Sequence, residues 1–255
     1  MQVCQEINSI LNLIIETGVP MKKSILATSL LAIALAVPMA QAHKAGDIII
    51  RAGAVHVNPH ESSSSIKGDR GPAAGVNVGG KATLDSDTQL GLNFAYMITD
   101  HIGVELLGAT PFTHNVHVKG TTLGPVADGK LGKVSHLPPT LSLVYYPADA
   151  SQAFQPYLGV GVNYTWFFDE SLSNSARNRG AAFHNFKVKN TWGWAAQIGA
   201  DYMITDNLML NAQVRYINID TRATVESYAL QSRVKVDLDV NPWVYMVGIG
   251  YKFSL

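Results

Sequence analysis

Residues 154–170, with the sequence FQPYLGVGVNYTWFFDE, constrain the fold more than any other part of the chain. Alternate side chains of a β-strand point to opposite faces, so this stretch has one wholly apolar face and one of mostly small or polar residues. The apolar face consists of Leu158, Val160, Val162, Tyr164, Trp166 and Phe168. In a soluble protein such a face packs against a core. In an outer-membrane barrel it meets lipid, and the other face lines the lumen.

Seven further segments alternate in the same way, and each reaches the roughly 9–11 residues with which a tilted strand crosses a bilayer. The eight predicted strands cover about residues 46–57, 88–98, 101–116, 134–146, 154–170, 188–204, 207–219 and 236–253.

The connections between these strands alternate in length. Residues 99–100, 147–153 and 205–206 are short turns, whereas residues 58–87, 117–133, 171–187 and 220–235 are long. A soluble sandwich does not sort its loops in this way, but an outer-membrane barrel does, and closure leaves no unpaired strand edge in lipid. The sequence therefore predicts an all-β fold, an eight-stranded antiparallel transmembrane β-barrel with short periplasmic turns and long extracellular loops.

The N-terminus has the features of a targeting segment. Met21-Lys22-Lys23 is basic, residues 24–38 are apolar, and Ala40-Gln41-Ala42 fits a cleavage site. We expect a leader or start-site extension at 1–20, a signal peptide at 21–42 and the barrel at 43–255, in the bacterial outer membrane. An alternative is that residues 7–15 and 25–37 form an anchor, although Glu16, Gly18 and Pro20 interrupt that stretch.

Charge and cysteine content exclude several classes of protein. Lys and Arg number 19, as do Asp and Glu, so the basic surface that nucleic-acid binding requires is missing. The only cysteine, Cys4, precedes the expected mature chain, which therefore has neither a disulfide nor a lipid-anchoring cysteine.

Four charged side chains point inward near the periplasmic ends of their strands: Arg51, Glu105, Asp201 and Lys252. Two positive and two negative groups at one level predict an ion network that closes the periplasmic half of the lumen. The alternative is that they simply fill a narrow barrel, because eight strands enclose a space just large enough for side chains. Both interpretations argue against a wide water-filled pore.

Two further features suggest a route for a solute. Leu107 and Arg215 come next along the inward faces, on strands that oppose each other across the barrel, and are candidates for a constriction. Pro111, Pro138 and Pro139 fall at similar heights on adjacent strands. Proline cannot donate to the strand ladder, so a gap in the wall is predicted there. It is either a harmless bulge near the rim or a lateral opening from the lumen to the membrane.

The sequence resembles the outer-membrane protein W (OmpW) family over nearly all of the expected mature chain. The matching stretches are HKAGD (43–47), DTQLGLNFAYMITDHIGVELLGATPF (87–112), HLPPTLSLVYY (136–146), FQPYLGVGVNYTWFF (154–168), TWGWAAQIGADYMI (191–204) and DVNPWVYMVGIGYKF (239–253). The resemblance implies an eight-stranded outer-membrane barrel with a hydrophobic lumen. It also implies passage of small apolar molecules, and some members have been linked to hydrocarbon uptake.

The sequence predicts no cofactor and no enzymatic activity. His56, His114 and His136 could gather near the extracellular rim, but no short ligand spacing supports a metal site. The sequence has no G-x-S-x-G elbow, phosphate-binding loop or Cys/His cluster. An outer-membrane lipid enzyme would need one of the rim histidines beside a Ser or Asp.

The leading hypothesis is a passive outer-membrane channel for small hydrophobic or amphipathic solutes. Its expected partners are outer-membrane lipid, those solutes and the barrel-assembly machinery. The alternative is a structural or recognition barrel whose long loops, above all residues 58–87, bind phage, bacteriocin or host partners.

Overall fold

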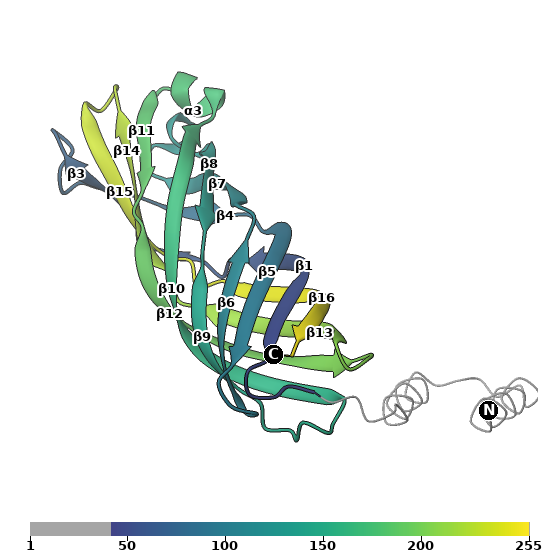
Figure 1. The fold of residues 1–255 in the computed structure, drawn as a ribbon. Coiled ribbons are helices and arrows are strands. Elements are labelled where there is room, and N and C mark those ends of the chain that lie inside the picture. Colours follow the sequence, from purple (N-terminus) through teal and green to yellow (C-terminus); the bar gives the residue numbers. More distant parts are fainter. Residues whose placement is uncertain (1–41, 255) are drawn as a thin grey trace, which may run out of the picture. The chain divides into compact units, whose positions relative to one another are not determined.

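The computed structural model describes residues 42–254; the expected leader and signal peptide, apart from Ala42, lie outside the described residues. Eight antiparallel strands form a closed barrel (Figure 1). In ring order they are β1 (Ile48–Asn58), β5 (Asp87–Met97), β6 (Ile102–Ala109), β9 (Thr140–Tyr145), β10 (Phe154–Leu172), β12 (Thr191–Met203), β13 (Leu208–Ile217) and β16 (Trp243–Phe253). β1 pairs with β5 and β16, and β10 pairs with β9 and β12, so the ring closes. The predicted eight-stranded antiparallel barrel is confirmed.

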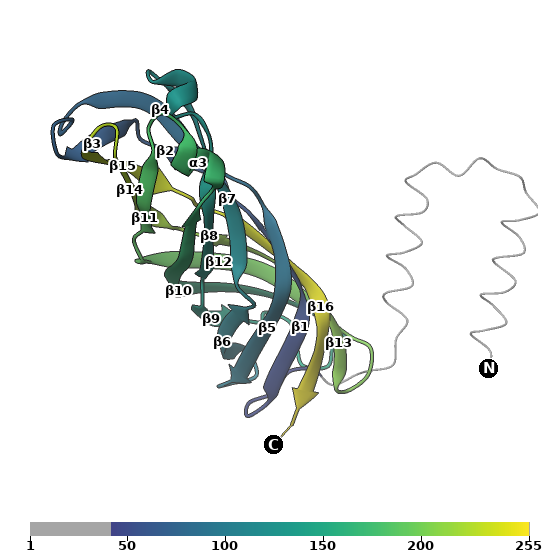
Figure 2. The ribbon, with the colours of Figure 1, turned by 90° about the horizontal axis from the view of Figure 1, so that it is seen from above.

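The two ends of the barrel differ in their connections. Short turns at 98–101, 146–153 and 204–207 lie at one end, together with Ile48 and its cross-strand partner Phe253. We call this the short-turn end. The four longer connections leave from the opposite end, which we call the long-connection end (Figures 1 and 2).

The outer face of the barrel is a belt of exposed large apolar side chains. Val160, Ile198 and Val247 are 64%, 66% and 67% exposed. Exposed aromatic residues flank the belt: Tyr96, Tyr145, Phe154, Tyr251 and Phe253 towards the short-turn end, and Trp166, Trp192, Trp194 and Trp243 towards the other. An apolar band between two aromatic girdles is the surface that a bilayer covers in outer-membrane barrels. The apolar face of residues 154–170 therefore belongs to the outer surface.

The sequence had suggested that the long connections are simple loops. In the structure they fold into a second sheet. Its strands are β11 (Phe183–Val188), β14 (Asp220–Ser227), β15 (Ser232–Asp239), β3 (Ile66–Arg70), β4 (Asn77–Leu84), β7 (Phe112–Thr121) and β8 (Gly129–Leu137), and a two-residue strand β2 (Ser62–Ser63) pairs with β15. We call this the upper sheet. The 19-residue strand β10 joins it to the barrel, pairing with β12 and β9 and, further along, with β8 (Figure 1).

The upper sheet carries two short helices, α3 (Asn174–Asn178) and the 3-10 helix η1 (Gly124–Val126). Within residues 42–254, no helix is long and apolar enough to cross a membrane.

Two of the predicted strands are each divided into two. The segment 101–116 forms β6 and β7, which are separated at Pro111, and the segment 134–146 forms β8 and β9, which are separated at Pro138 and Pro139. The interruption follows from the chemistry of proline, which has no N–H to donate and restricts the residue before it.

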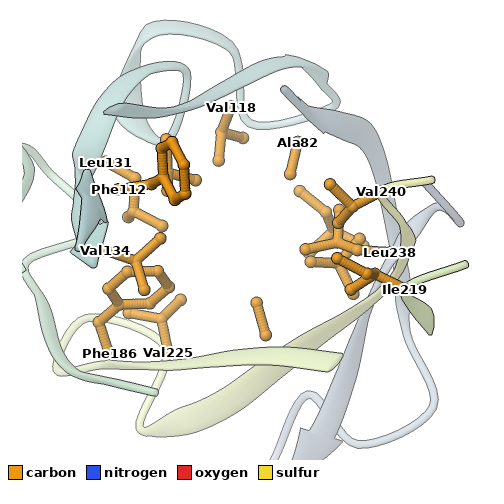
Figure 3. Close-up of a cluster of buried hydrophobic side chains, with 14 of the residues drawn as sticks. Ala82, Phe112, Val118, Leu131, Val134, Phe186, Ile219, Val225, Leu238 and Val240 are labelled. Atoms are coloured by element: carbon orange, nitrogen blue, oxygen red, sulfur yellow. The ribbon is translucent and has the colours of Figure 1, made fainter. Parts of the chain in front are cut away.

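Inward-facing side chains form three layers along the lumen. An apolar layer at the short-turn end contains Ile49, Met97, Tyr146, Met203 and Met209, among others. A charged and polar layer follows, beginning two residues further along β1 and β12, where Arg51 follows Ile49 and Asp201 precedes Met203. Beyond it lies an extended apolar cluster that includes Leu107 and continues through the upper sheet, where the labelled side chains point towards a common centre (Figure 3).

Candidate functional site

Arg51 is the centre of the charged layer. Its Nε donates to Oδ1 of Asp201 at 2.9 Å, and its Nη2 donates to Oδ2 of Asp201 at 2.5 Å and to the Tyr146 hydroxyl at 2.9 Å. Its Nη1 donates to Oδ1 of Asn93 at 3.2 Å and to Oε2 of Glu105 at 3.4 Å. One guanidinium therefore connects groups from several strands around the ring.

Arg215 forms the other half of this layer. Its Nη2 donates to Oε1 of Glu105 at 2.6 Å and also to the side-chain oxygen of Gln197. Gln197 in turn donates from Nε2 to the same Glu105 oxygen at 2.9 Å. Because β13 and β6 lie on opposite sides of the ring, this contact crosses the lumen.

The charged layer is buried and balanced. Arg51, Glu105 and Asp201 are 0% exposed and Arg215 is 1% exposed. Two guanidinium groups face two carboxylates, so the formal charges cancel. Removing one partner of such a buried pair typically costs 3–5 kcal/mol, because the other charge is left unpaired.

Three of the four residues predicted to form the ion network meet in it: Arg51, Glu105 and Asp201. Lys252 lies nearer the short-turn end, because the β1–β16 register places it opposite Ile49 rather than Arg51. There its Nζ is 3.8 Å from Oδ2 of Asp47 and donates to the Ala42 carbonyl at 2.7 Å.

Other members of the charged layer could be predicted only in part. Asn93 and Gln197 share the inward parity of the predicted residues. Asp201 also accepts hydrogen bonds from Nε2 of His43 and from Nδ2 of Asn211, each at 2.9 Å. His43 precedes the first strand, and no pattern in the sequence identifies it.

The predicted constriction residues lie in different layers. Arg215 bonds within the charged layer, whereas Leu107, 5% exposed, belongs to the apolar cluster beyond it. The two residues therefore mark the boundary where a charged surface meets an apolar one. Further along, a cavity with about 50 Å³ of free volume is lined mainly by aliphatic and aromatic side chains of the upper sheet, including Val118, Leu131, Phe186 and Val225 (Figure 3).

The wall beside this apolar region contains a gap in its hydrogen-bond ladder. The β6–β9 ladder ends at the pair Leu107–Thr140, and the β7–β8 ladder resumes at the pair Phe112–His136. Pro111, Pro138 and Pro139 all lie in the unpaired stretch between these pairs.

Asn163 satisfies part of the backbone at this gap. Its Nδ2 lies 3.0 Å from the carbonyl oxygens of Pro138 and Pro139 and from Oγ1 of Thr140. Thr165 donates to the Asn163 side-chain oxygen at 2.7 Å. One side chain on β10 therefore braces the segment between β8 and β9.

Two of the three rim histidines come together. His114 and His136 lie on the paired strands β7 and β8 with their Nε2 atoms 2.8 Å apart, whereas His56 bonds to Thr88 at 2.8 Å. Among residues 42–254, no group of three or more His, Cys, Asp or Glu side chains is arranged to hold a metal ion.

Comparison with known proteins gives consistent matches. The family model described as the OmpW family matches residues 44–253. Outer membrane protein W of Vibrio cholerae serotype O1 is 41% identical over 233 residues, which cover 91% of this chain and 100% of that protein. The crystal structure of the outer membrane protein OprG from Pseudomonas aeruginosa is 50% identical with a TM-score of 0.77, over 84% of this chain and 99% of that one. The dibenzothiophene metabolism operon protein PahQ of Pseudomonas aeruginosa is 28% identical over 175 residues, 69% of this chain and 76% of that protein.

Proposed function

Because the chain belongs to the OmpW family, we propose that it is a passive channel through which small hydrophobic or amphipathic molecules diffuse across the outer leaflet. It is a protein of the bacterial outer membrane, so its short-turn end faces the periplasm and its long-connection end faces the outside. Its relatives are outer-membrane barrels. We infer that membrane lipid surrounds its apolar belt and that the barrel-assembly machinery inserts it.

The observation that carries the proposal is the order of the layers in the lumen. A solute that enters from outside meets the apolar cluster of the upper sheet first and then the charged layer around Arg51. An apolar molecule gains free energy by leaving water for the first layer, at about 25 cal/mol per Å² of buried apolar surface. It gains nothing from the second layer, where every carboxylate already has hydrogen-bond partners.

The ladder gap offers the solute another way out. It interrupts the ladder of the wall between Leu107–Thr140 and Phe112–His136, on the apolar side of the charged layer. We infer that the solute leaves sideways through this gap into the hydrocarbon, where an apolar molecule is stable. The name of PahQ links one relative to the metabolism of an apolar aromatic compound, which agrees with this class of solute.

A disulfide across the gap tests this route. Cysteines at Ala109 and Pro138, each two residues beyond the last pair Leu107–Thr140, stand on the two sides of the gap and can be tied by a disulfide or, if they are too far apart, by a short reducible bifunctional thiol reagent. The only natural cysteine is Cys4, before the expected mature chain. Uptake of an apolar arene by cells with an intact lipopolysaccharide leaflet should fall to the level of cells without the barrel, and a reductant should restore it.

A matched control carries cysteines at Leu106 and Leu141, which pair directly within the β6–β9 ladder on the lipid-facing side. This disulfide should leave uptake unchanged. Equal uptake by the oxidised and reduced forms of the gap variant would refute the lateral route. A stable, large ion conductance in planar bilayers would refute the closed charged layer and indicate a water-filled porin.

A second candidate function is recognition at the cell surface. It is favoured by the ordered upper sheet, whose hairpin between β14 and β15 presents Tyr228, 68% exposed and stacked on His184 at a centroid distance of 3.7 Å. Shortening this hairpin should abolish binding of a phage, bacteriocin or host partner without reducing arene uptake. Retained binding by the shortened protein would refute this role.

A further inference from the structure

The two histidines at the ladder gap belong to a buried group of four aromatic rings. The ring of His136 stacks on Phe112 with centroids 5.5 Å apart, and it lies 5.6 Å from the ring of Phe167. It meets His114 edge to edge, with nearly parallel ring planes and centroids 4.9 Å apart. His114 and His136 are 2% and 5% exposed. The group lines the apolar lumen at the level where the β7–β8 ladder resumes after the gap.

The hydrogen bonds determine which nitrogen of each neutral ring carries the proton. Nδ1 of His114 lies 2.5 Å from the backbone carbonyl oxygen of Asp85, which can only accept, so this nitrogen is the donor. Nε2 of neutral His114 is then an acceptor. Because it lies 2.8 Å from Nε2 of His136, the latter nitrogen carries the proton and donates it.

This chain of donors leaves one acceptor unused. With its proton on Nε2, neutral His136 has a lone pair on Nδ1, and that buried atom has no hydrogen-bond partner. A buried polar atom without a partner is destabilising, so such atoms normally mark a water or ligand position. Here the free lone pair belongs to a ring flanked by Phe112 and Phe167.

We propose that Nδ1 of His136 is a hydrogen-bond acceptor site that selects, among apolar solutes, those carrying one O–H donor, with phenols as the preferred class. The proposal rests on the proposed channel function and names its substrate class. The phenol ring would pack against the aromatic side chains while its hydroxyl donates to Nδ1. An ether or hydrocarbon of the same shape would leave the acceptor unpaired.

The same geometry argues against a metal at this position. A metal ion needs several free ligand atoms. Of the four imidazole nitrogens, the two Nε2 atoms are hydrogen-bonded to each other and Nδ1 of His114 is hydrogen-bonded to the Asp85 carbonyl. Only Nδ1 of His136 is left. A single neutral acceptor beside phenyl rings suits a neutral donor molecule.

Nitrogen NMR of the ¹⁵N-histidine-labelled barrel in lipid nanodiscs tests the site directly. In the free protein, His136 should be protonated on Nε2 and unprotonated on Nδ1. Titration with 4-ethylphenol should shift the Nδ1 resonance, whereas 4-ethylanisole, which lacks the donor, should not. Protonation on Nδ1, or equal shifts with both compounds, would overturn the proposal. An Nδ1 resonance that already reports a strong hydrogen bond and does not respond to the phenol would indicate a bound water only, which also overturns it.

Uptake measurements test the consequence for selectivity. One hydrogen bond is worth about 1 kcal/mol, so the uptake ratio of 4-ethylphenol to 4-ethylanisole should be about fivefold higher in the wild type than in His136→Phe. The double variant His114→Phe/His136→Phe guards against misfolding, because replacing both partners by apolar rings leaves no unpaired polar group.

The control is His56→Phe, on the outer face of β1, which should keep the wild-type ratio. An unchanged ratio in both His136 variants would refute the acceptor site. If the wild type takes up neither compound, the channel proposal fails, but the NMR titration still decides whether His136 binds the phenol.

Discussion

Replacing Arg51 with Met should be among the most damaging single changes in the barrel. The substitution keeps much of the side-chain length but removes five hydrogen bonds, of which three end on the carboxylates of Asp201 and Glu105. Asp201 retains His43 and Asn211, and Glu105 retains Arg215 and Gln197. The buried layer would then hold two carboxylates and one guanidinium, with one uncompensated negative charge.

The expected loss follows from that imbalance. Removing one partner of a fully buried ion pair costs about 3–5 kcal/mol. The double variant Arg51→Met/Asp201→Asn restores the charge balance, so it should be more stable than the sum of the single losses predicts by about 2 kcal/mol. Urea unfolding in detergent micelles, followed by tryptophan fluorescence, gives the free energy of unfolding of all four proteins in this double-mutant cycle: the wild type, the two single variants and the double variant.

Arg222→Met is the matched control. Arg222 also forms a 2.6 Å ion pair, with Asp237, but on the exposed face of the upper sheet. Exposed pairs contribute about 0–1 kcal/mol, so this variant should unfold close to the wild type. A loss below about 1 kcal/mol for Arg51→Met, or strictly additive losses in the cycle, would refute the view that Arg51 neutralises the charged layer.

Three further predictions concern the upper lumen and the wall. Burial, with a smaller effect of neighbouring His114, lowers the pKa of His136 to about 3, below its unfolded value of about 6.5. Between these values the unfolded chain binds a proton that the folded chain does not, so stability should fall as the pH falls, by about 2 kcal/mol from pH 7.5 to pH 5. In His136→Phe, urea titrations should show a free energy of unfolding without this pH-dependent contribution. His114 and the carboxylates that act on it, Asp85, Asp87 and Glu61, are present in both proteins. An identical pH dependence in both proteins would contradict the assignment to His136. Asn163→Ala should cost about 1–3 kcal/mol and speed hydrogen exchange at Thr140, because it frees the carbonyls of Pro138 and Pro139; unchanged exchange would show that Asn163 does not brace the gap. Gly199→Ala should cost about 1–3 kcal/mol, because the added Cβ would lie 2.5 Å from Cζ of Tyr157; a wild-type unfolding midpoint would contradict this.

The barrel could be predicted from the sequence because it depends on a local pattern. Each membrane strand shows its two faces within about ten residues, as residues 154–170 do, and the lengths of the connections indicate which end is which. The upper sheet was predicted only in part: the start of β7, the end of β8 and the end of β15 fall in predicted strands, whereas the rest falls in the predicted long loops. Register shifts interrupt β3, β4 and β7, and glycines with positive φ such as Gly79 and Gly80 break the alternation that a strand would show.

For the candidate site, the alternation of side chains along a strand predicts which residues face inward but not which of them meet. Parity identifies Arg51, Glu105 and Asp201 as inward-facing, but their partners depend on how far neighbouring strands are displaced along one another. That displacement places Lys252 beside Ile49 and lets Arg215 reach Glu105 rather than face Leu107. The pairing of His114 with His136 likewise depends on the β7–β8 register, which the intervening residues do not reveal.

The pairing of β1 with β16 has a consequence for the order of assembly. Arg51 is 150 residues from Asp201 in the sequence, and the ring closes only when the final strand reaches β1. Contacts between such distant residues form late, because the entropy of closing a long loop must be overcome first. Until then, Asp201 lacks its guanidinium partner, although Arg51 can already pair with Glu105, and an unpaired charge is costly in hydrocarbon. We therefore expect a partly closed ring to be less stable in the bilayer than the closed one, and the barrel to enter the bilayer as the last strand pairs.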